Sequence, residues 1–198
     1  MFKNVMLVAA LAVGSMSFSQ EGFRATEHIV TEGPYRTLGK WLTIEESLVT
    51  EVEGKTAQEI YDSAVKFIKM NFKSPDDVIL SKIEGEYIRF EGISRDKLKI
   101  DVWGKDYSFD IKYNIIIRFK DGRFKTDISK LETYTPPSKH IVGGWSERSF
   151  AFKITDKKGK AKKDGIHSYN LIRNTFNDIV FGIKDQCMSN ELAGFNGW

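Results

Sequence analysis

Hydrophobic and polar positions follow different periods along the chain, and each change of period predicts a change of secondary structure. Behind Thr56 and Glu59, apolar residues recur at steps of three and four, which predicts a helix with one apolar stripe. The stripe consists of Ile60, Ala64, Phe67, Ile68 and Phe72. Thr56 and Glu59 match the T-x-x-E pattern of a capping box, so we expect the helix to start there and to stop at Ser74-Pro75.

From residue 78 the period becomes two, which predicts antiparallel strands with one apolar face. Residues 78–84 and 86–93 flank Gly85 as a hairpin, and a further strand is expected over residues 98–102. The clearest alternation covers residues 109–120, and Asp121-Gly122 predicts a tight turn into a returning strand. Leu131 is out of phase in that strand, which indicates a bulge or the strand's end.

Less regular segments complete the order of elements. Residues 43–52 favour a strand before the first helix, residues 135–147 a loop, and residues 150–154 a short strand. A last helix is expected over about residues 168–184. A strand, a helix, a run of antiparallel strands and a helix together predict an α+β two-layer sandwich with the helices on one face of the sheet.

Residues 1–19 are typical of an export signal. Lys3 precedes an apolar run over residues 5–13, and Ser17 and Ser19 have the small-x-small spacing of a cleavage site before Gln20. The run is shorter than the roughly 20 residues of a membrane-spanning helix. We therefore expect a periplasmic or secreted protein without a transmembrane segment in the mature chain. After the signal peptide we expect an N-terminal arm (20–42), a single α+β domain (43–186) and a C-terminal tail (187–198).

Three motifs resemble those of a known family. They are Thr56-Ala57-Gln58-Glu59-Ile60-Tyr61 in the first helix, Ile83-Glu84-Gly85-Glu86-Tyr87-Ile88 in the hairpin, and Lys120-Asp121-Gly122-Arg123 at the turn. With the order of elements, they resemble exported bacterial proteins that carry a domain of unknown function with a fold like that of the TATA-box-binding protein (TBP-like). The resemblance covers about residues 43–183. It implies a β-α-β4-α architecture and a Gram-negative envelope setting, but no activity and no catalytic residues, and such a fold does not imply DNA binding.

Charge and cysteine content narrow the classes of function. The formal net charge of +3 is too small for a general affinity for nucleic acid, and export makes that role less suitable still. Cys187 is the only cysteine, so the fold has no internal disulfide. We expect Cys187 to be a buried small hydrophobe, with a free thiol or an intermolecular bridge as alternatives.

The sequence contains no signature of catalysis, of a cofactor or of a metal site. His28, His140 and His167 lack the spacing that places two ligands on one helical face, and no G-x-S-x-G or phosphate-binding loop occurs. Paired acid and base carboxylates could be formed in the fold from acids such as Asp110 and Asp127. An envelope hydrolase is therefore kept as an alternative, as is a carrier with a small-ligand site between helices and sheet.

Two sets of residues are candidates for binding. Aromatic residues in the expected arm, loops and tail can anchor a protein partner, fold back as a satellite core, or form a carbohydrate platform: they are Tyr35, Trp41, Tyr134, Trp145 and Trp198. The expected turn over residues 156–165 carries five lysines, which suit contact with an anionic surface or a solvated hairpin tip: they are Lys157, Lys158, Lys160, Lys162 and Lys163. We expect an exported, non-enzymatic binding or assembly module of the cell envelope that contacts a protein partner, with peripheral envelope contact as a further possibility.

Overall fold

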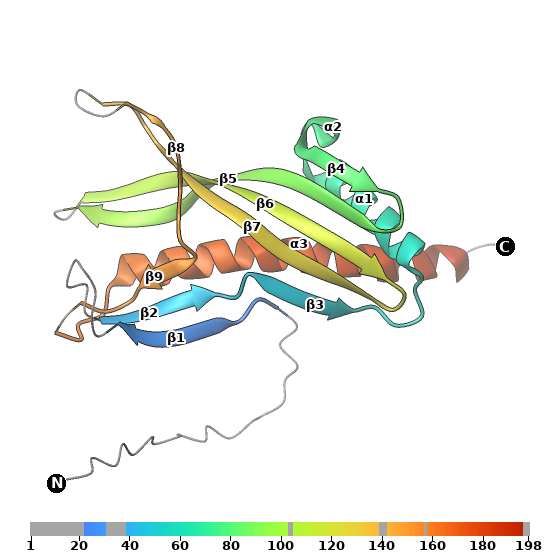
Figure 1. The fold of residues 1–198 in the computed structure, drawn as a ribbon, viewed down its shortest axis with the longest axis horizontal. Coiled ribbons are helices and arrows are strands. Elements are labelled where there is room, and N and C mark those ends of the chain that lie inside the picture. Colours follow the sequence, from blue (N-terminus) through green and yellow to red (C-terminus); the bar gives the residue numbers. More distant parts are fainter. Residues whose placement is uncertain (1–21, 31–38, 103–104, 139–141, 157, 196–198) are drawn as a thin grey trace, which may run out of the picture.

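The computed structural model describes residues 22–30, 39–102, 105–138, 142–156 and 158–195, and within these ranges it contains two antiparallel sheets and three helices (Figure 1). The predicted leader over residues 1–19 lies outside the described residues. The strands are β1 (Ala25–Val30), β2 (Gly39–Ile44), β3 (Ser47–Glu51), β4 (Ile79–Ile83), β5 (Tyr87–Val102), β6 (Lys105–Lys120), β7 (Arg123–Thr135), β8 (Gly144–Glu147) and β9 (Ala151–Lys153). The helices are α1 (Ala57–Asn71), α2 (Pro75–Val78) and α3 (Lys163–Phe195).

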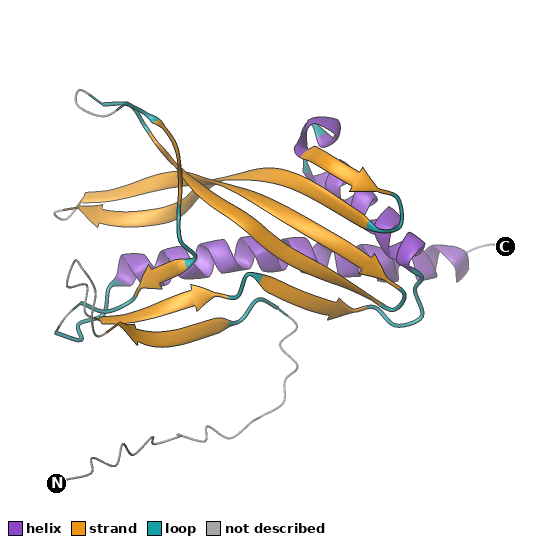
Figure 2. Cartoon of the chain, viewed as in Figure 1, coloured by secondary structure: helices purple, strands orange, loops and turns teal. Residues whose placement is uncertain are grey.

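The larger sheet confirms the predicted architecture. Its strands lie in the order β3-β7-β6-β5-β4, and β8 pairs with the last residues of β7. The path from β3 through α1 and the four strands β4 to β7 to α3 is the expected β-α-β4-α order. The two long helices cover one face of this sheet and leave the other open, so the fold is the predicted two-layer α+β sandwich (Figure 2).

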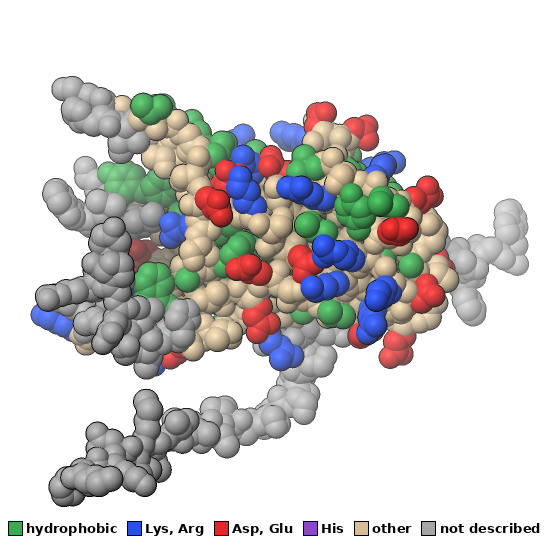
Figure 3. All heavy atoms as spheres, viewed as in Figure 1, with side chains coloured by type: hydrophobic (Ala, Val, Ile, Leu, Met, Phe, Trp, Pro, Cys, Tyr) green, Lys and Arg blue, Asp and Glu red, His purple; other side chains and the backbone are tan. Residues whose placement is uncertain are grey.

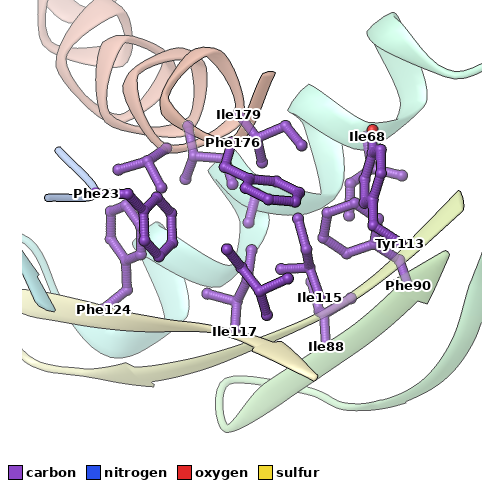
Figure 4. Packing of buried hydrophobic residues seen from close by; sticks show 14 of the residues in the cluster. Phe23, Ile68, Ile88, Phe90, Tyr113, Ile115, Ile117, Phe124, Phe176 and Ile179 are labelled. Atoms are coloured by element: carbon purple, nitrogen blue, oxygen red, sulfur yellow. The ribbon is translucent and has the colours of Figure 1, made fainter. Parts of the chain in front are cut away.

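The period-two pattern of β6 builds one side of the core. Alternate residues of this strand are buried under the helices, as the sequence predicts: Ile111, Tyr113, Ile115, Ile117 and Phe119. On α3, Phe176 meets Phe23 and Tyr113 edge to face, with ring centroids 6.0 and 5.4 Å apart (Figure 4). Each such buried side chain contributes about 1.5–3 kcal/mol, so this layer holds the sheet and α3 together.

The start of α1 is held by its own capping box and by the β6–β7 turn. Thr56 Oγ1 accepts a hydrogen bond from the Glu59 backbone N–H, and Glu59 Oε2 accepts one from the Thr56 N–H at 2.8 Å. Asp121 Oδ1 accepts a hydrogen bond from the Ala57 N–H at 2.8 Å. In the same turn, Gly122 has a φ of +77°, which glycine adopts without strain. The predicted helix start and the predicted turn are thus confirmed and are joined to each other.

Bulges shape both long hairpins. The register between β6 and β7 shifts between Asn114 and Ile115, next to Ser129, so Leu131 is turned to the buried face as the phase break predicts. The two strands expected over residues 86–93 and 98–102 form one strand, β5, with an irregular register between Ser94 and Leu98. The polar residues of this irregularity interrupt the sequence pattern without ending the strand.

A second sheet, absent from the sequence-based prediction, is formed by β1, β2 and β9. The expected arm over residues 20–42 contains β1 and most of β2, and the expected strand over residues 43–52 is divided at Glu45-Glu46 between the two sheets. Ile44 N–H bonds to the Phe150 carbonyl, whereas the Glu46 carbonyl accepts from Ile128 N–H. These strands are stabilised by distant partners, so local periodicity did not reveal them.

The last helix is longer at both ends than predicted. α3 continues to Phe195, through most of the segment expected to be a tail, and residues 196–198 lie outside the described part. Cys187 is buried, which confirms the expectation of a small hydrophobe, and burial raises the pKa of its thiol. Cys187 continues the buried stripe of Val180 and Ile183, so packing against the rest of the fold reaches one residue of that stripe beyond the predicted end at Lys184.

Candidate functional site

The β7–β8 hairpin bends away from β5 and β6 (Figure 1). It carries a pair of aromatic residues in contact with each other. Tyr134 of β7 lies directly opposite Trp145 of β8, and their ring centroids are 5.3 Å apart. Trp145 is 36% exposed, although it packs against Tyr134. Residues 135–147 were expected to be a loop, but part of this segment is β8, because its backbone pairs with β7. This register brings together two residues that the sequence suggested separately.

Charged side chains of β6 and β7 pack against this pair. Lys112 Nζ lies 5.0 Å from the Trp145 ring centroid and 2.9 Å from Glu132 Oε2. Lys130 Nζ lies 3.1 Å from Glu132 Oε1. Burial of Glu132 alone would raise its pKa, but the hydrogen bonds and charges of the two lysines outweigh burial and lower the pKa of this carboxyl. Glu132 is therefore an anion that fixes Lys112 under the tryptophan. We call Lys112, Tyr134 and Trp145 the aromatic platform.

The rest of the open sheet face carries ion pairs with aliphatic side chains between them. Asp127 accepts hydrogen bonds from Ser47 at 2.7 Å and from Arg118, and it pairs with Lys125 at 2.9 Å. Burial of Asp127 would raise its pKa, but these partners outweigh burial and lower it. Side chains of both charges alternate over this face, with apolar groups between them (Figure 3). Asp127, an acid suggested for paired-carboxylate chemistry, thus lies among cations.

The other suggested aromatic residues do not join the platform. Trp41 lies in β2, half-buried, and its indole Nε1 is buried without a hydrogen-bond partner among the described residues. Tyr35 and Trp198 lie outside the described residues. The third member of the platform is Lys112, a residue that the sequence did not suggest as a binding group. The only available signal was its outward position in the alternating pattern of residues 109–120.

The lysine-rich turn connects the end of β9 to the start of α3. It borders a cleft of about 1070 Å³ beside the start of this helix. Lys160, Lys162 and Lys163 of the predicted set line it, together with Lys99 from β5. Its remaining lining residues are Asp156, Ala161, Asp164, Ile166, His167 and Asn170. Lys158 is exposed outside this lining, and Lys157 lies outside the described residues.

Hydrogen bonds explain why Lys99 joins residues so distant in sequence. The Lys99 backbone N–H donates to Ser168 Oγ at 2.8 Å, and Ser168 Oγ donates to the Lys99 carbonyl at 2.9 Å. Ser168 is buried at the second turn of α3, so this pair fastens β5 to the helix beside the cleft. Sequence reasoning missed Lys99 because nothing local to residues 98–102 indicates this contact.

A second groove, of about 800 Å³, lies between α1, α2, β5 and α3, where the sequence allowed a small-ligand site. Phe67, Ile93, Tyr113 and Ile179 contribute its apolar surface, and Asp77, Glu91 and Arg95 its charges. Burial raises the pKa of Tyr113, whose hydroxyl hydrogen bonds with Ser94. Tyr113 is a neutral group there at physiological pH.

No group of three or more His, Cys, Asp or Glu side chains that could hold a metal ion occurs in the described part of the chain. His28 lies in β1 and His167 at the cleft, whereas His140 lies outside the described ranges. Among the helices of the described residues, none is both long enough and apolar enough to cross a membrane.

Comparison with known proteins identifies a domain of unknown function. Residues 47–134 match the model of the family "Domain of unknown function (DUF4468) with TBP-like fold". A TBP-like protein from Parabacteroides distasonis is 16% identical, with a TM-score of 0.45, over 70% of this chain and 90% of that one. A DUF4468 family protein from Bacteroides ovatus is 14% identical, with a TM-score of 0.41, over 79% of this chain and 88% of that one. No curated protein matches the chain.

Proposed function

We propose that this protein, which carries a domain of the DUF4468 family with its TBP-like fold, is an exported, non-enzymatic binding module of the bacterial cell envelope. Because the family is a domain of unknown function, the proposal is argued from the surfaces of the molecule. Its partner is a protein, held at the aromatic platform. The observation that carries the proposal is the pair of Tyr134 and Trp145, which pack with tilted rings on the β7–β8 hairpin, with Lys112 against the indole.

The platform has the properties of an interface anchor. Trp and Tyr are enriched among residues whose truncation costs about 2 kcal/mol or more in protein complexes. Here Trp145 is already positioned by Tyr134 and Lys112, so little side-chain entropy remains to be lost on binding. A partner that covers the indole also removes water from the contact between Lys112 and the ring, which strengthens it.

The surroundings of the platform favour a protein over a sugar. Ile93 lies opposite Lys112 in the β5–β6 ladder and is 56% exposed, so aliphatic surface continues beside the aromatic pair. The ion pairs of Glu132 and Asp127 border this surface. An apolar centre with a charged rim is the usual composition of a protein interface.

Delivery to the envelope rests on the predicted leader over residues 1–19. Expression in the native host, followed by fractionation and intact-mass measurement, tests this part. We expect a periplasmic or secreted protein that begins at Gln20. A cytosolic protein with Met1 or Phe2 at its amino terminus would contradict export.

Photo-crosslinking from position 145 tests the binding function. Trp145 is replaced by p-benzoylphenylalanine in the native host, and the cross-linked protein is identified, purified and titrated against the wild type. Trp145→Ala should weaken that binding about tenfold or more. Phe181→Ala is the matched control, because Phe181 is a similarly exposed aromatic residue (39%) on α3, and its affinity should stay near that of the wild type. Equal affinity of Trp145→Ala and the wild type would refute the platform as the binding site.

A further inference from the structure

Positive charge collects at the cleft beside the start of α3 without an equal number of anions. Four lysines and two aspartates line it, which leaves a formal charge of +2. One of the two acids has a structural role, because Asp156 Oδ1 accepts hydrogen bonds from the backbone N–H groups of Lys158 and Lys160, at 2.8 and 2.9 Å. These bonds lower the pKa of Asp156, whose carboxylate holds the turn.

The position of the lysines opposes the usual electrostatics of a helix. Lys162 and Lys163 lie at the amino-terminal end of α3, where the helix dipole favours acidic residues and disfavours cations. Asp164 offsets part of this charge, at 3.9 Å from Lys162 Nζ. Lys160 and Lys163 make no ion pair with another described residue. An anion in the cleft would relieve both the mutual repulsion and the unfavourable dipole interaction.

The backbone that carries these lysines is fixed before any ligand arrives. Thr155 and Ala161 form a β-bridge across the turn, and the Lys162 N–H donates to the Ile154 carbonyl at 2.8 Å. On the opposite wall, the bonds between Lys99 and Ser168 hold β5 against α3. A ligand therefore has only the lysine side chains to order, which lowers the entropic cost of binding.

We propose that this cleft binds a phosphate monoester through Lys160, Lys162 and Lys163. Such a group carries a charge of about −1.5 to −2 at neutral pH, which matches the charge of the lining, and lysine is a common phosphate-binding residue. The Lys99 ammonium donates to Ser108 Oγ, so Lys99 contributes positive charge to the wall and is not counted among the binding groups. The volume of about 1070 Å³ far exceeds one phosphate, so the group that bears the phosphate occupies the rest. There Asn170 and His167 offer polar contacts to its hydroxyl groups. The phosphate belongs either to a lipid headgroup or to a soluble molecule. In both cases the lysines contact the same phosphate monoester.

Two probes with the same phosphate monoester distinguish these sources. Glycerol 3-phosphate is titrated by calorimetry, and phosphatidylcholine vesicles with or without phosphatidic acid are used in co-sedimentation, both at low salt. Lys160→Gln, Lys162→Gln and Lys163→Gln combined should weaken binding about tenfold or more. Lys66→Gln, Lys69→Gln and Lys82→Gln combined make the same charge change on α1 and β4, at the opposite end of α3 (Figure 1), and should leave binding within about twofold.

A third variant distinguishes loss of positive charge from disruption of the fold as the cause of weaker binding. Lys160→Arg, Lys162→Arg and Lys163→Arg combined keep the charges and should retain most of the affinity. Binding of glycerol 3-phosphate with or without the vesicles supports the cleft as a soluble-ligand site, and binding of phosphatidic acid vesicles alone supports a lipid site. Absence of binding of both probes to the wild type, or equal losses in the cleft variant and the distant control, would overturn the proposal. Trp145→Ala should leave this binding unchanged, so the result is independent of the aromatic platform.

Discussion

Replacing Gly165 by alanine should destabilise the protein, because the first turn of α3 lies almost against the end of β9. A Cβ atom at position 165 would lie 1.9 Å from the Lys153 carbonyl oxygen. An ordinary carbon–oxygen contact is about 3.3–3.6 Å, so the helix start and the strand would have to separate by roughly 1.5 Å. The Cβ atom is attached directly to the backbone and the Lys153 carbonyl is part of it, so no side chain can rotate away to make room.

Two opposing effects set the magnitude. Alanine is about 1 kcal/mol better than glycine inside a helix, and the gain is smaller in a first turn. Overpacking of this kind costs about 1–3 kcal/mol. Separation would also strain the hydrogen bonds from Lys162 N–H to the Ile154 carbonyl and from Ile154 N–H to the Lys40 carbonyl, each contributing about 0.5–1.5 kcal/mol. We expect a net loss of about 1–3 kcal/mol in the free energy of unfolding.

Thermal and urea unfolding, followed by circular dichroism and by tryptophan fluorescence, measure this loss. At about 2–4 °C per kcal/mol for a protein of this size, Tm should fall by about 2–12 °C. Gly144→Ala is the matched control, because a Cβ there meets no atom within 4 Å, and its stability should change by less than about 0.5 kcal/mol. An unchanged or raised Tm for Gly165→Ala would refute the close approach of α3 and β9.

Three further predictions concern a cap, a buried carboxylate and the thiol. Thr56→Ala removes the capping box of α1 and should cost about 1 kcal/mol in urea unfolding; a loss below about 0.3 kcal/mol would speak against the cap. The pKa of Glu132 is lower in the folded protein than its unfolded value of about 4.3. The contribution of this carboxylate to stability is therefore present above that pH and is lost as pH falls through the folded pKa. Glu132→Gln should lose less stability in acid than the wild type, and curves of unfolding free energy against pH that run parallel for the two proteins would contradict this. Burial of Cys187 predicts slow reaction with a thiol reagent until denaturant is added, and equal rates in both states would disagree with the structure.

The elements predicted correctly depend on information within a short stretch of chain. The stripe and cap of α1 follow from steps of three and four behind Thr56, and β6 follows from its alternation and the Asp121-Gly122 turn. β1 and β2 lack such a local pattern, because their hydrogen bonds come from each other and from β9, far along the sequence. Their recognition therefore required the folded chain.

The candidate sites divide in the same way. Tyr134 and Trp145 were suggested by residue type, but only the β7–β8 register places one opposite the other and above Lys112. The lysine cluster was visible in composition, whereas Lys99 reaches the same cleft only through the bonds of its backbone with Ser168. Residue type thus indicates which groups can bind, and pairing between strands determines which of them act together.

By itself, the amino-acid sequence determined the α+β class, the main helix and strands with their turns, the expectation of export, and the chemical character of the candidate residues. Only the tertiary structure decided the second sheet, the length of α3, the aromatic platform and the lysine-lined cleft. The physical reason is the range of the interactions. Periodicity and capping act over a few residues, whereas strand register and helix packing bring together groups whose separation along the chain carries no signal of their contact.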